Sequence, residues 1–111
     1  MSDENRIEVE EGSGNLWADI GRADADEALA RAELMRRISE GIRARGLTQA
    51  AAAGVLGTTQ PTISDLVRGK LSRFSLERLI AFLNALGQDV EIVVRPNPAS
   101  GDARGRIRVA A

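Results

Sequence analysis

The stretch from Leu47 to Lys70, LTQAAAAGVLGTTQPTISDLVRGK, constrains the fold more than any other part of this chain. Thr48 and Thr59 each stand where a side-chain oxygen can cap the free amides at the start of a helix. Gly57 and Gly69 follow at the positions where those helices would stop. The pattern predicts two short helices joined by a tight turn, over residues 49–56 and 60–68.

The contact between these two helices places its own demands on the sequence. Two helices can cross steeply at a three-residue turn only if the residues between them are small or apolar. The second helix should pass close to position 53, which therefore requires a small residue such as Ala53. We expect Gly57 to adopt a positive φ. The other positions predicted to face inward are Ala52, Leu56, Ile63 and Leu66.

A longer helix is predicted before this unit. It should begin at Asp24, whose carboxylate would cap the first turn, with Glu27 completing a capping box. Gly46 should end it as a left-handed residue. Its expected core stripe is Leu34, Ile38 and Ile42, flanked by Leu29 and Met35.

The segments after the unit predict one more helix and one strand. Ser75 would cap a helix over residues 76–86, and Phe74 would pack on Leu79 as a hydrophobic staple. Val90, Ile92 and Val94 then alternate with other residues at the period of a β-strand, expected over residues 89–95. The fold class is therefore all-α, with about five helices and one C-terminal strand.

The ends of the chain are expected to lie outside the packed domain. Residues 1–14 are acidic and predict a disordered arm, and residues 15–21 predict a short helical hook that anchors Trp17. Residues 96–111 predict a flexible basic tail. The domain itself should span residues 15–95.

Composition excludes several classes of function. The 111 residues contain no His, Cys or Tyr, so the commonest general base, the thiol nucleophile and thiolate metal sites are absent. We expect no enzymatic activity, no metal and no cofactor. There is no apolar run long enough to cross a bilayer and no targeting pattern, so a cytoplasmic protein without a membrane partner is expected.

The charge is unevenly distributed along the chain. Residues 1–40 carry eleven acids and five bases, whereas residues 41–111 carry five acids and ten bases, although the net charge is only −1. The later part is a plausible surface for a polyanion.

The outward side of the second short helix suggests what that polyanion is. An α-helix fits the major groove of DNA, and its first turn reaches the base edges. Gln60 could pair with adenine, Asp65 with a cytosine amino group, and Gln49 could bind a phosphate. Sequence-blind phosphate contacts are expected from Arg43, Arg68, Lys70 and Arg73. The complete predicted DNA-binding set is Gln49, Thr59, Gln60, Pro61, Thr62, Ser64, Asp65, Arg68, Lys70, Arg73 and Arg43.

These residues resemble a known family. Gly57-Thr58-Thr59-Gln60, followed by Ile63, Leu66 and Gly69-Lys70, resembles the recognition segment of Xre/Cro-like helix-turn-helix regulators. The resemblance implies that Gln49 binds phosphate and that residues 59–61 and Asp65 face bases. Pro61 departs from the polar residue common there, so one hydrogen bond is lost.

A narrower resemblance covers about residues 15–95. The segments at 15–21, 32–34, 47–49, 72–75 and 86–92 are similar to antitoxins of HigBA-type toxin–antitoxin pairs. It implies a homodimer that represses its own operon and binds a small ribonuclease toxin.

A lone strand leaves its backbone groups unpaired, which gives a physical reason for a dimer. Pairing with the same strand of a second copy would join Val90, Ile92 and Val94 across a two-fold axis and match a palindromic DNA operator. A hairpin with residues 106–109 is the competing interpretation. The competing function is a protein-interaction module that neutralises a small toxin or another enzyme.

Overall fold

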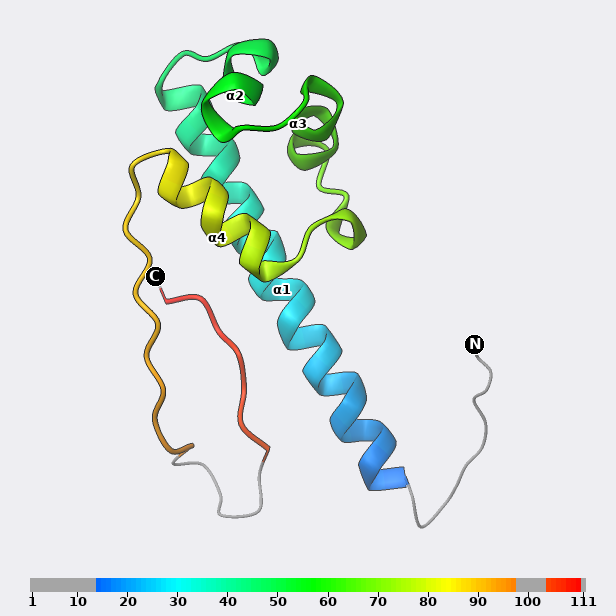
Figure 1. Ribbon diagram of the computed structural model, residues 1–111. Coiled ribbons are helices and arrows are strands. Elements are labelled where there is room, and N and C mark those ends of the chain that lie inside the picture. The colour runs from blue at the N-terminus through cyan, green and yellow to red at the C-terminus, as the bar shows by residue number, and fades with distance from the viewer. Residues whose placement is uncertain (1–13, 98–103, 111) are drawn as a thin grey trace.

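The computed structural model describes the backbone of residues 14–97 and 104–110, and their side chains from residue 24 onward. In this part of the chain there are four α-helices and one 3₁₀-helix, and the fold is all-helical as predicted. Helix α1 is the long rod in Figure 1, α4 packs along it, and α2 and α3 lie at its C-terminal end. None of the described helices combines the length and the apolar character needed to cross a membrane.

Helix α1 spans Gly14–Ala44, so the predicted start at Asp24 is wrong. Asp24 and Glu27 lie inside the helix, and the expected hook at 15–21 is part of the same helix backbone. A cap signature marks where a helix could begin, but residues 16–23 include Leu, Ala and Arg, which favour its continuation. The Trp17 side chain and residues 1–13 of the predicted arm 1–14 lie outside the described residues, and Gly14 begins α1.

The buried face of α1 follows the predicted stripe at its C-terminal half. Leu34, Met35, Ile38 and Ile42 are buried in the main core. Leu29 is 68% exposed, so its predicted role in the core is wrong. Ala30, one residue further along the helix, is buried in its place. The predicted left-handed residue after the helix is confirmed, with φ of 67° at Gly46.

Helices α2 (Gln49–Leu56) and α3 (Gln60–Val67) confirm the predicted pair, α3 ending one residue early. The Thr48 side chain accepts a hydrogen bond from the Ala51 amide at 3.0 Å and so caps α2. Thr59 caps α3 in the same way, and Pro61 lies in its first turn, where a missing amide hydrogen costs nothing.

The chain then returns to α1 through η1 (Leu71–Arg73) and α4 (Leu76–Ala85). Ser75 caps α4, as predicted, by accepting from the Arg78 amide at 3.1 Å. Phe74 and Leu79 are both buried in the core that α1, α2, α3 and α4 share. Arg31 of α1 donates from Nη1 to the Leu71 and Phe74 carbonyls, each at 3.5 Å, and holds the η1 segment against α1.

The predicted strand at 89–95 is not formed in the described structure of the single chain. Residues 88–97 are extended but belong to no strand, and Ile92, Val93 and Val94 are 74%, 64% and 91% exposed. A strand is defined by its neighbour, and periodicity in the sequence supplies only one side of that pairing. Val90 alone in this stretch packs against the core.

Residues 104–110 run back along the extended segment toward α1 (Figure 1). The Asn97 side-chain amide donates to the Arg104 carbonyl at 3.3 Å. Arg106 pairs with Asp26 of α1 at 3.3 Å, and Val109 packs partly against the core. Among the described residues these contacts do not make a β-hairpin.

Candidate nucleic-acid interface

The turn between α2 and α3 fixes the relative positions of the two helices. Gly57 has φ of 71°, a backbone conformation that residues other than glycine adopt only at an energetic cost. The Gly57 and Thr58 amides both donate to the Ala53 carbonyl, which closes α2 immediately before α3 begins. The predicted inward residues are confirmed, since Ala52, Ala53, Leu56, Ile63 and Leu66 are all buried.

Burial of Ile63 and Leu66 decides which side of α3 faces outward. Gln60 and Pro61 in its first turn are exposed, as is Arg68 at its end. Gln49 at the start of α2 is also exposed. Half-buried positions complete the predicted set on α3: Thr62, Ser64 and Asp65.

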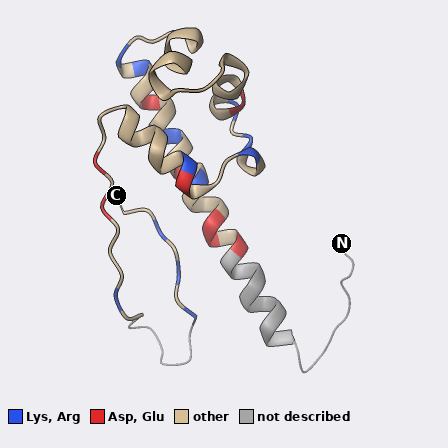
Figure 2. Ribbon diagram, in the orientation of Figure 1, with Lys and Arg blue, Asp and Glu red and all other residues tan. Residues whose placement is uncertain are grey.

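Cations flank this outward side. Figure 2 shows Lys and Arg along the segment that follows α3 and at the C-terminal end of α1. Arg43, Lys70 and Arg73 are exposed at these places. The cations therefore lie at the end of α3 and on α1, and such positive charge suits the binding of a polyanion.

Two threonines at the start of α3 bond to each other. The Thr59 hydroxyl accepts from the Thr62 amide at 3.3 Å and lies 2.9 Å from the Thr62 hydroxyl. Thr59 therefore caps α3. Any contact to a ligand would use the hydrogen-bond donors and acceptors that the two hydroxyls have left.

Asp65 lies among cations. Its two carboxylate oxygens are 3.4 Å from Lys70 Nζ and 3.4 Å from Arg73 Nη1. Three members of the predicted DNA-binding set are thus joined to one another within the protein.

Comparison with known proteins agrees with this geometry. Residues 16–95 match a protein family described as a helix-turn-helix domain. A solved structure assigned to the XRE family of transcriptional regulators is 46% identical, with 79% of this chain and 98% of that chain covered and a TM-score of 0.71. The chain belongs to the XRE-like helix-turn-helix family. No curated protein matches the sequence.

In this XRE-family protein, the α2–α3 turn is anchored to α4 by Arg78, a role that the sequence interpretation missed. Arg78 Nη2 donates to the Thr58 hydroxyl at 3.3 Å. Its guanidinium lies 5.5 Å from the Phe74 ring centroid and 5.4 Å from that of Phe82. The four-residue spacing of Phe74, Arg78 and Phe82 is the signal that could have revealed this cation–π arrangement.

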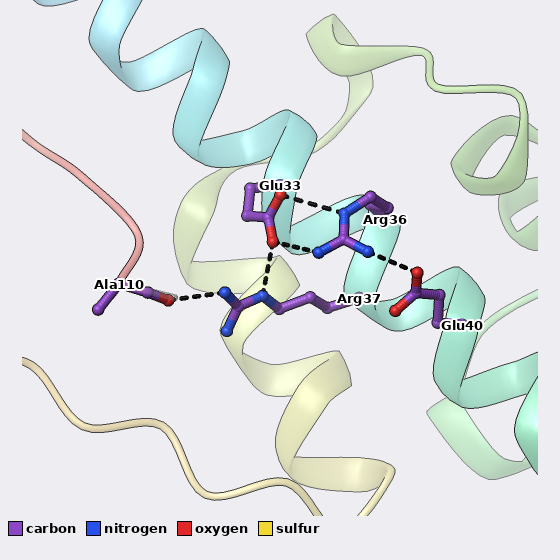
Figure 3. Close-up of polar contacts among 5 residues, drawn as sticks. All are labelled: Glu33, Arg36, Arg37, Glu40 and Ala110. Carbon is purple, nitrogen blue, oxygen red and sulfur yellow. Dashed lines mark hydrogen bonds and ion pairs between the residues drawn. The ribbon is translucent and has the colours of Figure 1, made fainter.

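Two arginines of α1, Arg36 and Arg37, pair with neighbouring carboxylates (Figure 3). Glu33 pairs with both Arg36 and Arg37, and Arg36 also pairs with Glu40. Arg37 donates to the Ala110 carbonyl at 2.6 Å. These hydrogen bonds from Arg36 and Arg37 lower the pKa of Glu33 to about 2.

Proposed function

We propose that this protein is a sequence-specific DNA-binding transcriptional regulator that places α3 in the major groove. The carrying observation is the orientation of α3: Ile63 and Leu66 hold one side in the core, while Gln60 and Pro61 in the first turn stay exposed. The first turn of a helix is the part that reaches base edges in a groove.

The side chains at this surface divide into base-reading and phosphate-binding groups. Gln60 has the amide that can make a bidentate pair with adenine, and Thr62 and Ser64 can bond or contact neighbouring positions. Gln49 is placed at the start of α2, where helix amides favour a phosphate. Cations around the surface supply sequence-blind attraction: Arg43, Arg68, Lys70 and Arg73.

We further propose that the regulator works as a homodimeric repressor. The extended segment 90–95 exposes Ile92 and Val94. Its backbone joins no strand among the described residues, so it could form a ladder with a second copy. A two-fold pair would present two α3 helices to half-sites about one DNA turn apart. The predicted interface comprises Val90, Ile92 and Val94.

An antitoxin role extends this proposal and rests on the resemblance described above. Its test is co-purification of the full chain with the product of a small basic reading frame beside its gene. A stable complex that blocks ribonuclease activity of that product supports the role, and free, fully active product in the presence of excess regulator contradicts it.

The DNA-binding proposal is tested by titrating the protein with its own upstream DNA at two salt concentrations, followed by fluorescence anisotropy. We expect binding that weakens steeply with salt, because phosphate contacts release counterions. Gln60→Ala should weaken operator binding by about 1–3 kcal/mol, the discrimination expected of one bidentate base contact. Its affinity for unrelated DNA should change little.

Gln88→Ala is the matched control, because Gln88 is also an exposed glutamine but follows α4 rather than lying on α3. It should leave both affinities unchanged. Wild-type binding that ignores salt and sequence would contradict the proposed function.

A further inference from the structure

The backbone after α3 brings Lys70 back over the last turn of the helix. Gly69, with φ of 76°, allows the chain to reverse. The Lys70 amide then donates to the Asp65 carbonyl at 3.1 Å and the Gly69 amide to the Leu66 carbonyl at 3.0 Å. This double hydrogen bond is a Schellman motif, which closes helix ends rigidly.

The η1 turn adds a second cation on the same side. The Arg73 amide donates to the Lys70 carbonyl at 3.1 Å, so Arg73 lies one 3₁₀ turn beyond Lys70. Arg31 fixes this turn on α1 through the Leu71 and Phe74 carbonyls. The side chains of Lys70 and Arg73 consequently converge on one carboxylate by virtue of the backbone.

Exposure shows how this cluster meets the solvent. The Asp65 side chain is 22% exposed, whereas those of Lys70 and Arg73 are 43% and 62% exposed. The carboxylate thus lies behind two cations that face outward. Two positive charges share one negative charge, and the cluster keeps a net charge of about +1 for an incoming anion.

We propose that Asp65 is an internal counter-ion that limits the attraction of Lys70 and Arg73 for DNA phosphates, and not a residue that reads a base. This inference rests on the proposed DNA-binding function. A phosphate that binds the two cations must compete with a carboxylate already 3.4 Å from each of them. The competition is independent of DNA sequence, so it lowers affinity for operator and unrelated DNA by the same factor.

The deciding variant is Asp65→Asn, which removes the charge and keeps the shape and the backbone hydrogen bonds. Releasing about one positive charge per protomer should steepen the slope of log affinity against log salt by about 0.9 per protomer. Near 0.1 M salt, that slope corresponds to tighter binding on the order of tenfold per protomer, for operator and unrelated DNA alike. The ratio of the two affinities should stay constant.

Two further variants keep this test specific. Glu77→Gln removes the same charge from an exposed position on α4 that has no ion pair in the described structure. It should change affinity less than about twofold because Glu77 occupies neither Lys70 nor Arg73. In a Lys70→Gln/Arg73→Gln background, Asp65→Asn should lose its effect, because the cations through which it acts are gone.

The outcomes separate this inference from the function on which it rests. Operator affinity that falls in Asp65→Asn while affinity for unrelated DNA holds would assign base reading to Asp65 and overturn the inference. A loss on all DNA, in a variant with unchanged thermal unfolding, would show that Asp65 positions the cations for binding, which also overturns it. If the wild-type protein shows no salt-dependent DNA binding, the proposed function fails, and the inference fails with it.

Discussion

Two glycines three residues apart in sequence should respond in opposite ways to substitution by alanine. Gly54 is inside α2, where an added Cβ would meet nothing within 4 Å. Gly57 has a positive φ in the turn before α3, where an added Cβ is strained even though the space is open. The same substitution at the two positions therefore separates backbone strain from packing.

We expect Gly57→Ala to lower the free energy of unfolding by about 1–2 kcal/mol, the cost of a left-handed residue with a Cβ. Gly54→Ala should raise it by about 0.4–1 kcal/mol, because alanine restricts the unfolded chain and favours the helix. Urea denaturation of the two variants and the wild type measures both values. A change of the same sign in both variants would contradict the assigned conformations.

The inward and outward residues of α2 and α3 could be predicted because each depends on local sequence. Ile63 and Leu66 are buried at the spacing that the helix period requires, and Gln60 is exposed for the same reason. The ion pairs of Asp65 and the stacking of Arg78 could not be predicted as readily. They depend on how η1 and α4 return to the unit, which only the tertiary arrangement determines.

At the scale of elements, most helix ends were predictable, whereas the start of α1 and the strand were not. Thr48, Thr59 and Ser75 start helices because their side chains satisfy amides a few residues ahead. Asp24 has the same chemistry but lies within α1, since a cap is used only if the preceding residues leave the helix. Strands are equally hard to predict from local sequence. The alternation of residues in the extended segment 88–97 does not show which other segment would pair with it.

The ion pairs of Glu33 with Arg36 and Arg37 on α1 make the stability of the folded protein depend on pH. The pKa of Glu33 is lowered from 4.5 to about 2 by hydrogen bonds from Arg36 and Arg37, so the folded protein favours the ionised carboxylate. The resulting stability is fully present above about pH 5 and is lost as the pH falls toward 2. Because these side chains are partly exposed, salt should weaken the effect.

Glu33→Gln should therefore be less stable than the wild type at pH 7, and the difference should shrink as the pH falls from 5 to 2. Thermal unfolding across this range measures it. Glu77→Gln is the control and should give a flatter difference, since Glu77 forms no ion pair in the described part of the chain. A constant difference for Glu33→Gln would contradict the assigned contacts.

At the scale of the whole molecule, the proposed dimer predicts that one negative charge introduced at its interface separates the two protomers. Val94 is 91% exposed, so Val94→Asp should leave the fold of one protomer intact. In the proposed dimer it would place two carboxylates near a two-fold axis and separate the copies. Sedimentation should shift from dimer to monomer, and operator affinity should fall because the two half-sites are no longer bound together.

Glu91→Gln, on the opposite side of the proposed strand, is the companion variant and should remain dimeric. A Val94→Asp protein that sediments as a dimer would exclude this interface. The chain cut after Gly87 gives a second measurement, and a dimer in that form would contradict the proposal as well.

The shallow attachment of α3 has a practical consequence for retargeting. Its eight residues, Gln60–Val67, contribute only Ile63 and Leu66 to the buried interior. Substitutions at its exposed positions should leave the scaffold of α1, α2 and α4 folded, provided that the Thr59 cap and Pro61 are kept. A combinatorial library over those outward positions is therefore a direct way to obtain folded variants that prefer other DNA sequences.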